Sequence, residues 1–215
     1  FRMSSSHRLC SSLILAASLL AVAVAFDDEF VTHTSVIKLQ NVQDAGSRLH
    51  SHEVKYGSGS GQQSVTAVKN SDDVNSHWQI MPALKESVAR GEPVKCGGKL
   101  RLKHLQTGCF LHSHNFQAPL SKGNQEVSCF GDDSHSDTGD NWELICSNDE
   151  WLESDSVRLR HVDTGAYLAL SGQQFGRPIA GQREVVGMSN GNAGGATWKT
   201  AEGVYMSKRK DVNGL

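Results

Sequence analysis

The feature that most constrains this chain is a segment of roughly 60 residues that occurs three times. In each copy a short apolar stretch leads to a glycine, and another apolar stretch follows it. Apolar and polar residues alternate on both sides of the glycine, which is typical of half-buried strands. Each copy therefore predicts a strand, a tight turn and a second strand. The aligned residues are Leu39, Leu102 and Leu159, then Gly46, Gly108 and Gly165, then Leu49, Leu111 and Leu168.

Each repeat continues with a third strand and ends on a tryptophan. The third strands are SVTAV, EVSCF and EVVGM, and the final elements carry Trp78, Trp142 and Trp198 at one repeated position. A large aromatic residue at an equivalent place in every repeat favours a core position, packed against its symmetry mates. A role in stacking against a ligand is the alternative.

Four strands in each of three repeats give about a dozen strands. One repeat cannot bury its apolar face alone, so the three are expected to close around a shared axis, which also removes exposed sheet edges. We therefore predict an all-β fold, a β-trefoil over residues 32–206, with repeats at about 32–84, 93–148 and 153–206 and a C-terminal tail at 207–215. The one helix-like stretch runs from Ala83 to Arg90.

The first 25 residues read as a leader and signal peptide. Arg8 precedes an apolar stretch from Leu13 to Val24, and cleavage is expected after Ala25. The stretch is well short of the roughly 20 residues that a membrane-spanning helix needs, so we expect no membrane span. Without the two leader arginines, 19 of the 21 basic residues remain against 23 acidic ones, a formal charge of −4. That charge argues against nucleic acid or heparin as a partner.

Four cysteines follow the predicted signal peptide: Cys96, Cys109, Cys129 and Cys146. An even number in a secretory protein predicts disulfides. The spacing fits neither a C-x-x-C redox pair nor a zinc site. Of the three possible connectivities, nesting favours Cys96 with Cys146 and leaves Cys109 and Cys129 to pair or to stay reduced.

Two H-x-H pairs, His50 with His52 and His112 with His114, are the strongest candidates for a binding site. Alternate positions on a strand place both imidazoles of a pair on one face. The third repeat has Ala169 there, so a complete threefold metal site is not expected, and we predict no metal and no cofactor. Two interpretations remain: structural hydrogen bonds, or a groove that contacts a peptide or a glycan and titrates near pH 6.5.

The glycine-rich segment from Tyr56 to Gly61 joins two predicted strands. No helix follows it to hold a phosphate, so we expect a flexible hairpin loop. Loops of this kind often carry contacts, which makes Tyr56, Gly57 and Gly59 candidates for partner binding. The chain has no G-x-S-x-G or H-E-x-x-H motif, and we predict that it is not an enzyme.

Longer strings carry a family resemblance: RLHSHEVKYGSGSGQQSVT, LHSHNFQAPLS, NQEVSCFGDD, GDNW and AEGVYM. They resemble the MIR domain of protein O-mannosyltransferases and of inositol trisphosphate and ryanodine receptors. From about Thr32 to Met206 the chain is similar to the stromal cell-derived factor 2 family. The resemblance implies a soluble protein of the endoplasmic reticulum lumen that joins a J-domain co-chaperone and the lumenal Hsp70 in quality control of unfolded client proteins.

The resemblance is incomplete at the last residues, because members of the family commonly end in a retrieval tetrapeptide. This chain ends Asp211-Val212-Asn213-Gly214-Leu215, which is not a KDEL-like signal. We therefore expect retention in the lumen through a partner, with secretion also possible. Two other functions stay open: a lectin-like module for O-mannosyl-type glycans and a secreted trefoil ligand.

Overall fold

The computed structural model describes residues 30–207, so the predicted signal peptide and nearly all of the C-terminal tail lie outside the described residues. Strands follow one another with two short 3-10 turns and no α-helix in this range. The strands are β1 (Val36–Asn41), β2 (Arg48–Lys55), β3 (Gln63–Val68), β4 (Trp78–Pro82), β5 (Lys99–His104), β6 (Phe110–Gln117), β7 (Gln125–Phe130), β8 (Trp142–Ile145), β9 (Ser156–His161), β10 (Tyr167–Gln174), β11 (Arg183–Met188) and β12 (Trp198–Val204). The 3-10 turns are η1 (Val74–Ser76) and η2 (Thr138–Asp140).

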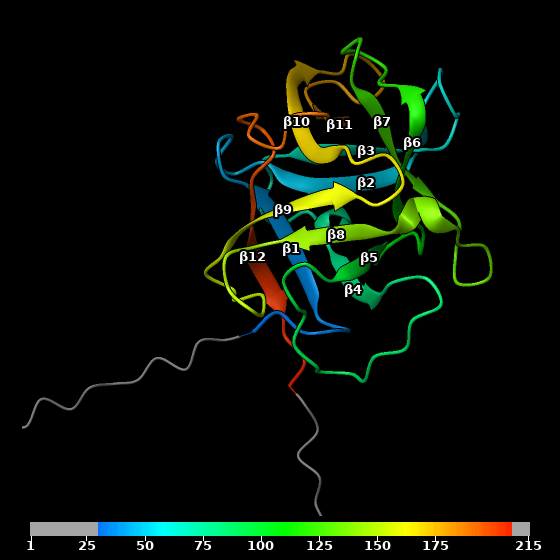
Figure 1. The fold of residues 1–215 in the computed structure, drawn as a ribbon. Coiled ribbons are helices and arrows are strands. Elements are labelled where there is room, and N and C mark those ends of the chain that lie inside the picture. The colour runs from blue at the N-terminus through cyan, green and yellow to red at the C-terminus, as the bar shows by residue number, and fades with distance from the viewer. Residues whose placement is uncertain (1–29, 208–215) are drawn as a thin grey trace, which may run out of the picture.

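The first and last strands of each repeat form a closed barrel. Antiparallel pairing runs from β1 to β4, β5, β8, β9 and β12, and then back to β1. These strands occupy the lower half of Figure 1. Closure leaves the barrel without an edge strand, as the prediction from the repeats requires.

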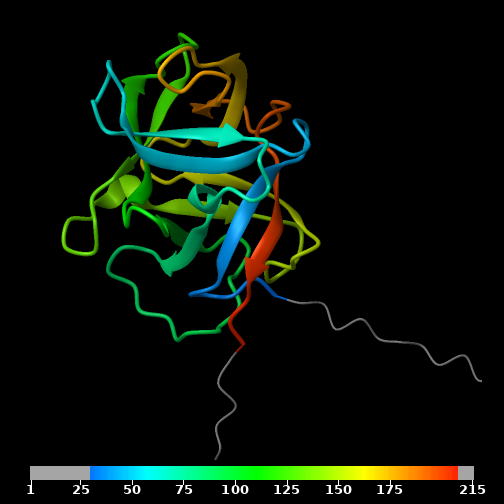
Figure 2. The ribbon, with the colours of Figure 1, turned by 180° about the vertical axis from the view of Figure 1, so that it is seen from behind.

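The second and third strands of each repeat form hairpins that cap the barrel. The hairpins are β2–β3, β6–β7 and β10–β11, and their third strands pair with one another in all three combinations. Figures 1 and 2 show this cap above the barrel from two sides. A barrel closed by three hairpins with threefold symmetry is a β-trefoil, so the predicted fold class is confirmed.

The repeated tryptophans lie in the core. Trp78, Trp142 and Trp198 are fully buried, and each indole N–H donates to the carbonyl of a second-strand leucine at 2.8 to 3.0 Å. The donor groups thus tie the barrel to the cap in the same way in every repeat. The acceptors are Leu49, Leu111 and Leu168.

The glycine shared by the repeats has a local structural reason. Gly46, Gly108 and Gly165 have φ values of 94°, 79° and 73°, a left-handed backbone that residues with a Cβ rarely adopt. Each follows a first strand and allows the chain to turn into the second strand.

The segment from Ala83 to Arg90 is not a helix, which corrects the prediction for this stretch. The Leu84 N–H donates to the side chain of Asn141, the Glu86 N–H closes a single turn onto the Ala83 carbonyl, and the neighbouring Gly91 N–H donates to the carbonyl of His33. Lys85 has a φ of 68°, which interrupts a right-handed helix at this point.

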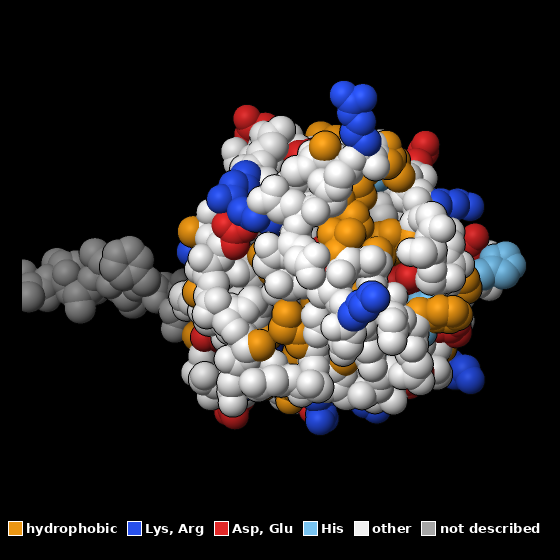
Figure 3. All heavy atoms as spheres, turned by 90° about the horizontal axis from the view of Figure 1, so that it is seen from above, with side chains coloured by type: hydrophobic (Ala, Val, Ile, Leu, Met, Phe, Trp, Pro, Cys, Tyr) orange, Lys and Arg blue, Asp and Glu red, His pale blue; other side chains and the backbone are white. Residues whose placement is uncertain are grey.

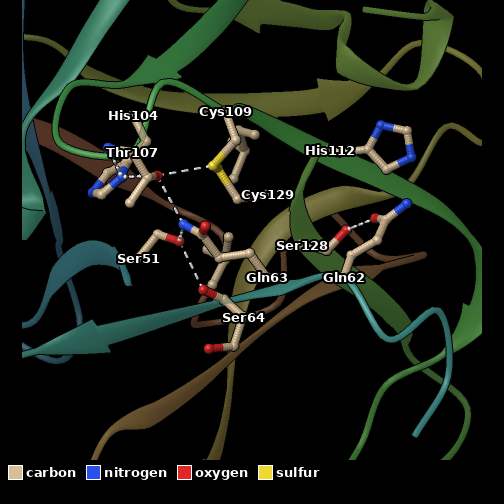
Figure 4. The surroundings of a disulfide bond; sticks show 12 residues. Ser51, Gln62, Gln63, Ser64, His104, Thr107, Cys109, His112, Ser128 and Cys129 are labelled. Atoms are coloured by element: carbon tan, nitrogen blue, oxygen red, sulfur yellow. Dashed lines mark hydrogen bonds between the residues drawn. A yellow bond between two sulfur atoms is a disulfide. The ribbon is translucent and has the colours of Figure 1, made fainter. Parts of the chain in front are cut away.

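Both pairs of cysteines form disulfides, Cys96 with Cys146 and Cys109 with Cys129. The first closes the second repeat at its two ends. The second joins the residue before β6 to β7 within one hairpin of the cap, beside Thr107 and Gln63 (Figure 4). The pairing of Cys109 with Cys129 decides an alternative that spacing left open.

Candidate functional site

Hollows lie at the junctions between repeats. Each junction brings together a second strand, the loop before a tryptophan and the first turn of the next repeat. One hollow, of about 340 Å³, lies between repeats two and three and includes His112 and His114. Another, of about 500 Å³, lies between repeats three and one and includes Arg183 and Asp44. His50 and His52 occupy the corresponding place at the junction of repeats one and two.

The first histidine pair is held by side chains of two repeats. His50 is buried, with Nδ1 3.2 Å from the Thr66 hydroxyl and Nε2 3.5 Å from a carboxylate oxygen of Asp73. His52 places Nε2 3.1 Å from Oε1 of Gln182, which comes from the third repeat. Burial lowers the pKa of His50 to about 4, although the Asp73 charge acts in the opposite direction. This imidazole is therefore neutral at pH 7.

The second pair contacts carboxylates. His112 Nδ1 lies 3.0 Å from Oδ1 of Asp140 and 3.6 Å from Oδ1 of Asp137. His114 Nε2 lies 3.1 Å from Oε1 of Glu126. Asp140 and Glu126 are fully buried, so each imidazole supplies a partner that its carboxylate requires.

His112, Asp137 and Asp140 have potential ligand atoms within 4.8 Å of one another. Their other contacts explain this closeness without an ion. Asp140 Oδ2 accepts from the Ser136 hydroxyl and the Asp137 N–H, and Asp137 accepts from Gly139, which together form a capping box around η2. Hydrogen bonding that orders the loop before Trp142 is thus sufficient to account for the cluster.

The structure places Tyr56, a predicted partner contact, in the interior of the cap. Its side chain is buried, and its hydroxyl lies 2.9 Å from the carbonyl oxygens of both Val65 and Val127. Tyr56 therefore joins the hairpins of the first two repeats inside the cap, and burial raises the pKa of its phenol.

The rest of the glycine-rich loop is exposed at Gly57 and Gly59 but is anchored beside them. Ser60 donates to Glu126 through its hydroxyl and its N–H. A Cβ on Gly59 would lie 2.0 Å from Oε2 of Glu126, so glycine permits this close approach. Gly57 and Gly59 stay candidates for partner contact.

Two buried histidines escaped the sequence analysis. His104 and His161 each place Nδ1 within 2.8 Å of a threonine hydroxyl three residues later and Nε2 within 2.9 Å of a carbonyl in the preceding repeat. Each ring also packs on a repeated tryptophan, with centroids 4.9 to 5.0 Å apart. Burial lowers the pKa of both. The shared spacing H-x-x-T-G was a signal that could have identified them.

Figure 3 views the cap from above and shows hydrophobic side chains near its centre, with one basic side chain beside them and most other charged groups toward the rim. Val54 and Phe116, at matching positions of β2 and β6, are exposed. The Phe116 ring packs on His114 at 4.6 Å between centroids. In the part of the chain that the structure describes, no helix is long and apolar enough to cross a membrane.

Comparisons with known proteins agree with this architecture. The model of the MIR domain matches residues 47–155. Stromal cell-derived factor 2-like protein 1 of Mus musculus is 49% identical over 183 residues, which cover 85% of this chain and 81% of the mouse protein.

Solved structures give the same result. A Caenorhabditis elegans protein of unknown function is 67% identical, with a TM-score of 0.80 over 82% of this chain and 98% of that one. The Saccharomyces cerevisiae protein O-mannosyltransferase Pmt1–Pmt2 complex bound to the sugar donor matches at 28% identity and a TM-score of 0.74, over 86% of this chain and 27% of that one. The chain therefore belongs to the stromal cell-derived factor 2 family of MIR-domain proteins.

Proposed function

We propose that this protein is a non-catalytic binding subunit of the endoplasmic reticulum lumen, which joins a J-domain co-chaperone and the lumenal Hsp70 and helps to keep unfolded client proteins soluble. Membership of the stromal cell-derived factor 2 family supports this choice of partners. The proposal that the protein is non-catalytic rests on the structural hydrogen bonds made by the candidate side chains. His50 and His114 contact side chains of the cap, and His112 contacts Asp140 in the loop before Trp142.

The proposed compartment rests on the two disulfides, since such bonds persist in oxidising environments and are rare in the cytosol. The rigid trefoil would act by presenting several surfaces at once, which raises the effective concentration of a client near the co-chaperone.

Affinity purification from lumenal extract tests the proposal. An epitope tag placed after the predicted cleavage site should bring down an Hsp70 and a J-domain protein under gentle conditions. A disulfide-bonded lumenal protein of another family, tagged in the same way, is the control for nonspecific client binding. Recovery of neither chaperone above that control would contradict the proposal.

A glycan-binding module is the second candidate, supported by the polar hollow beside His114 and by the likeness to the O-mannosyltransferase structure. Titration with mannose and with O-mannosyl peptides, followed by NMR of the full chain, tests it. Saturable shifts at residues around His114 that are lost in His114→Ala would favour this function. Shifts that persist in the variant would place the sugar elsewhere.

A secreted trefoil ligand is the third. Fractionation of expressing cells distinguishes it from a lumenal subunit, since a ligand would accumulate in the medium while a retained subunit would fractionate with the endoplasmic reticulum.

A further inference from the structure

The three junctions between repeats are closed by the residue that begins each third strand of the cap. Gln63 donates to the Thr107 hydroxyl at 2.9 Å, and Gln125 accepts from the Thr164 hydroxyl at 2.7 Å. Both contacts are neutral. At the third junction the same strand position holds Arg183.

Arg183 makes a charged contact where the other junctions have a neutral one. Its Nε lies 2.9 Å from Oδ2 of Asp44, and Oδ1 of the same carboxylate lies 3.1 Å from Nζ of Lys69. Two cations therefore share one carboxylate, which leaves an excess positive charge. A guanidinium has five N–H donors in a fork that matches a carboxylate. A single contact through Nε uses fewer donors than this fork offers.

The third junction also has less bulk than the others. Where the first two repeats place His50 and His112, the third has Ala169, and the loop before its tryptophan contains Gly194 and Gly195. The junction of repeats two and three has an imidazole paired with carboxylates. The hollow at that junction has about 340 Å³, whereas the hollow at the junction of repeats three and one has about 500 Å³.

The lining of this hollow mixes one charged pair with neutral and apolar groups. Arg183 and Asp44 are the only charged side chains among the described residues that line it. Gln43 and Ser171 add groups able to form hydrogen bonds, and Leu170 and Met188 add apolar surface. A ligand that carries a carboxylate beside an apolar group matches both the charged and the apolar part of this lining.

We propose that the hollow at the junction of repeats three and one is a binding site for a carboxylate group, held by the guanidinium of Arg183, with the apolar part of the ligand against Met188. This site goes beyond the proposed function and does not depend on it. The carboxylate could belong to a peptide C-terminus or to a sugar acid, which share the chemistry that Arg183 recognises.

NMR titration of the ¹⁵N-labelled chain tests the proposal with matched probes. N-acetyl-leucine carries a free carboxylate, and N-acetyl-leucinamide replaces it with an amide. Glucuronate and glucose form the equivalent pair for sugars. We expect saturable shifts of the Gly194 and Gly195 amides with one or both carboxylates and binding more than tenfold weaker with its uncharged partner. The pair that responds identifies the source.

Two variants and one control separate this site from general charge effects. Arg183→Gln restores the residue type of the other two repeats and should weaken binding at least tenfold. Ala169→His adds the bulk found in those repeats and should also weaken it. Arg160→Gln removes an arginine paired with Glu143 outside the hollow and should change nothing.

Three results would overturn the site: no saturable shift with any probe at millimolar concentration, unchanged affinity in both variants, or equal affinity for each acid and its uncharged partner. Tighter binding of inorganic phosphate than of the carboxylates would overturn the assignment to a carboxylate. The spectrum of each variant shows whether it is folded, and Ala169→His keeps the test valid if Arg183→Gln is not.

Discussion

Glu126 in β7 accepts hydrogen bonds from both the hydroxyl and the N–H of Ser60, which lies in the glycine-rich loop of the preceding repeat. The carboxylate is fully buried and also lies 3.1 Å from Nε2 of His114. A buried carboxylate with several donors contributes stability that an isolated one would not. This contact therefore orders a loop that its glycines would otherwise leave mobile.

Replacement of Glu126 should consequently destabilise the protein. Glu126→Gln keeps the shape but loses the charge, and hydrogen bonds to charged groups contribute about 1.5–3 kcal/mol. We expect the free energy of unfolding in urea to fall by about that amount. Glu143→Gln, which removes a carboxylate from a more exposed ion pair with Arg160, should cost about 0–1 kcal/mol. Equal losses in the two variants would contradict the role assigned to Glu126.

The fold could be predicted because its determinants repeat. The alternation around Gly46, Gly108 and Gly165 and the recurrence of tryptophan reflect local geometry and burial, which a sequence records directly. Threefold recurrence then left few ways to bury the apolar faces.

The details of the candidate site could not be predicted because they depend on partners from other repeats. The sequence placed Tyr56 in an exposed loop, but its hydroxyl donates to the carbonyl of Val127, about 70 positions away. The stretch from Ala83 has a helix-like pattern, but its Leu84 N–H donates to the side chain of Asn141. Contacts at such separations leave no periodic trace in the sequence.

The indole N–H of a repeated tryptophan should make a measurable contribution. Trp142→Phe leaves the Leu111 carbonyl without its donor and opens a small cavity, so we expect a loss of about 2–4 kcal/mol in the free energy of unfolding. Trp151 is a matched control, because it is equally buried but its Nε1 has no hydrogen-bond partner among the described residues. Trp151→Phe should cost less. A greater loss in that variant would show that side-chain volume, and not the hydrogen bond, governs the effect.

The two disulfides should differ in their reaction with reductant. Cys109 and Cys129 are buried, whereas Cys96 and Cys146 are half-buried. Thiol–disulfide exchange requires access of the attacking thiolate, so a mild thiol reductant applied to the folded protein should open the bond between Cys96 and Cys146 first. Alkylation followed by mass spectrometry identifies the released cysteines. Unfolding in urea should abolish the order, and the reverse order in the folded protein would contradict the prediction.

Stability should fall in mild acid because of His50. Its pKa in the folded protein is about 4, below the ordinary value of about 6.5 in an unfolded chain. Between these pH values the unfolded state binds a proton at His50 and the folded state does not. The contribution of His50 to the free energy of unfolding is therefore fully present above about pH 6.5 and is lost as the pH falls toward 4. One pKa unit corresponds to about 1.4 kcal/mol, which gives about 3 kcal/mol for this group. Burial also lowers the pKa values of His104 and His161, and both add to the slope in the same direction.

Urea unfolding at several pH values between 4 and 7 measures the slope, and His50→Asn isolates the contribution of this residue. The variant loses the imidazole that must remain neutral, so its stability should vary less with pH than that of the parent chain. His135→Asn is the control for loss of an imidazole at an exposed position, since His135 lies on the loop after β7. A parent slope preserved in His50→Asn would assign the pH dependence to the other buried histidines.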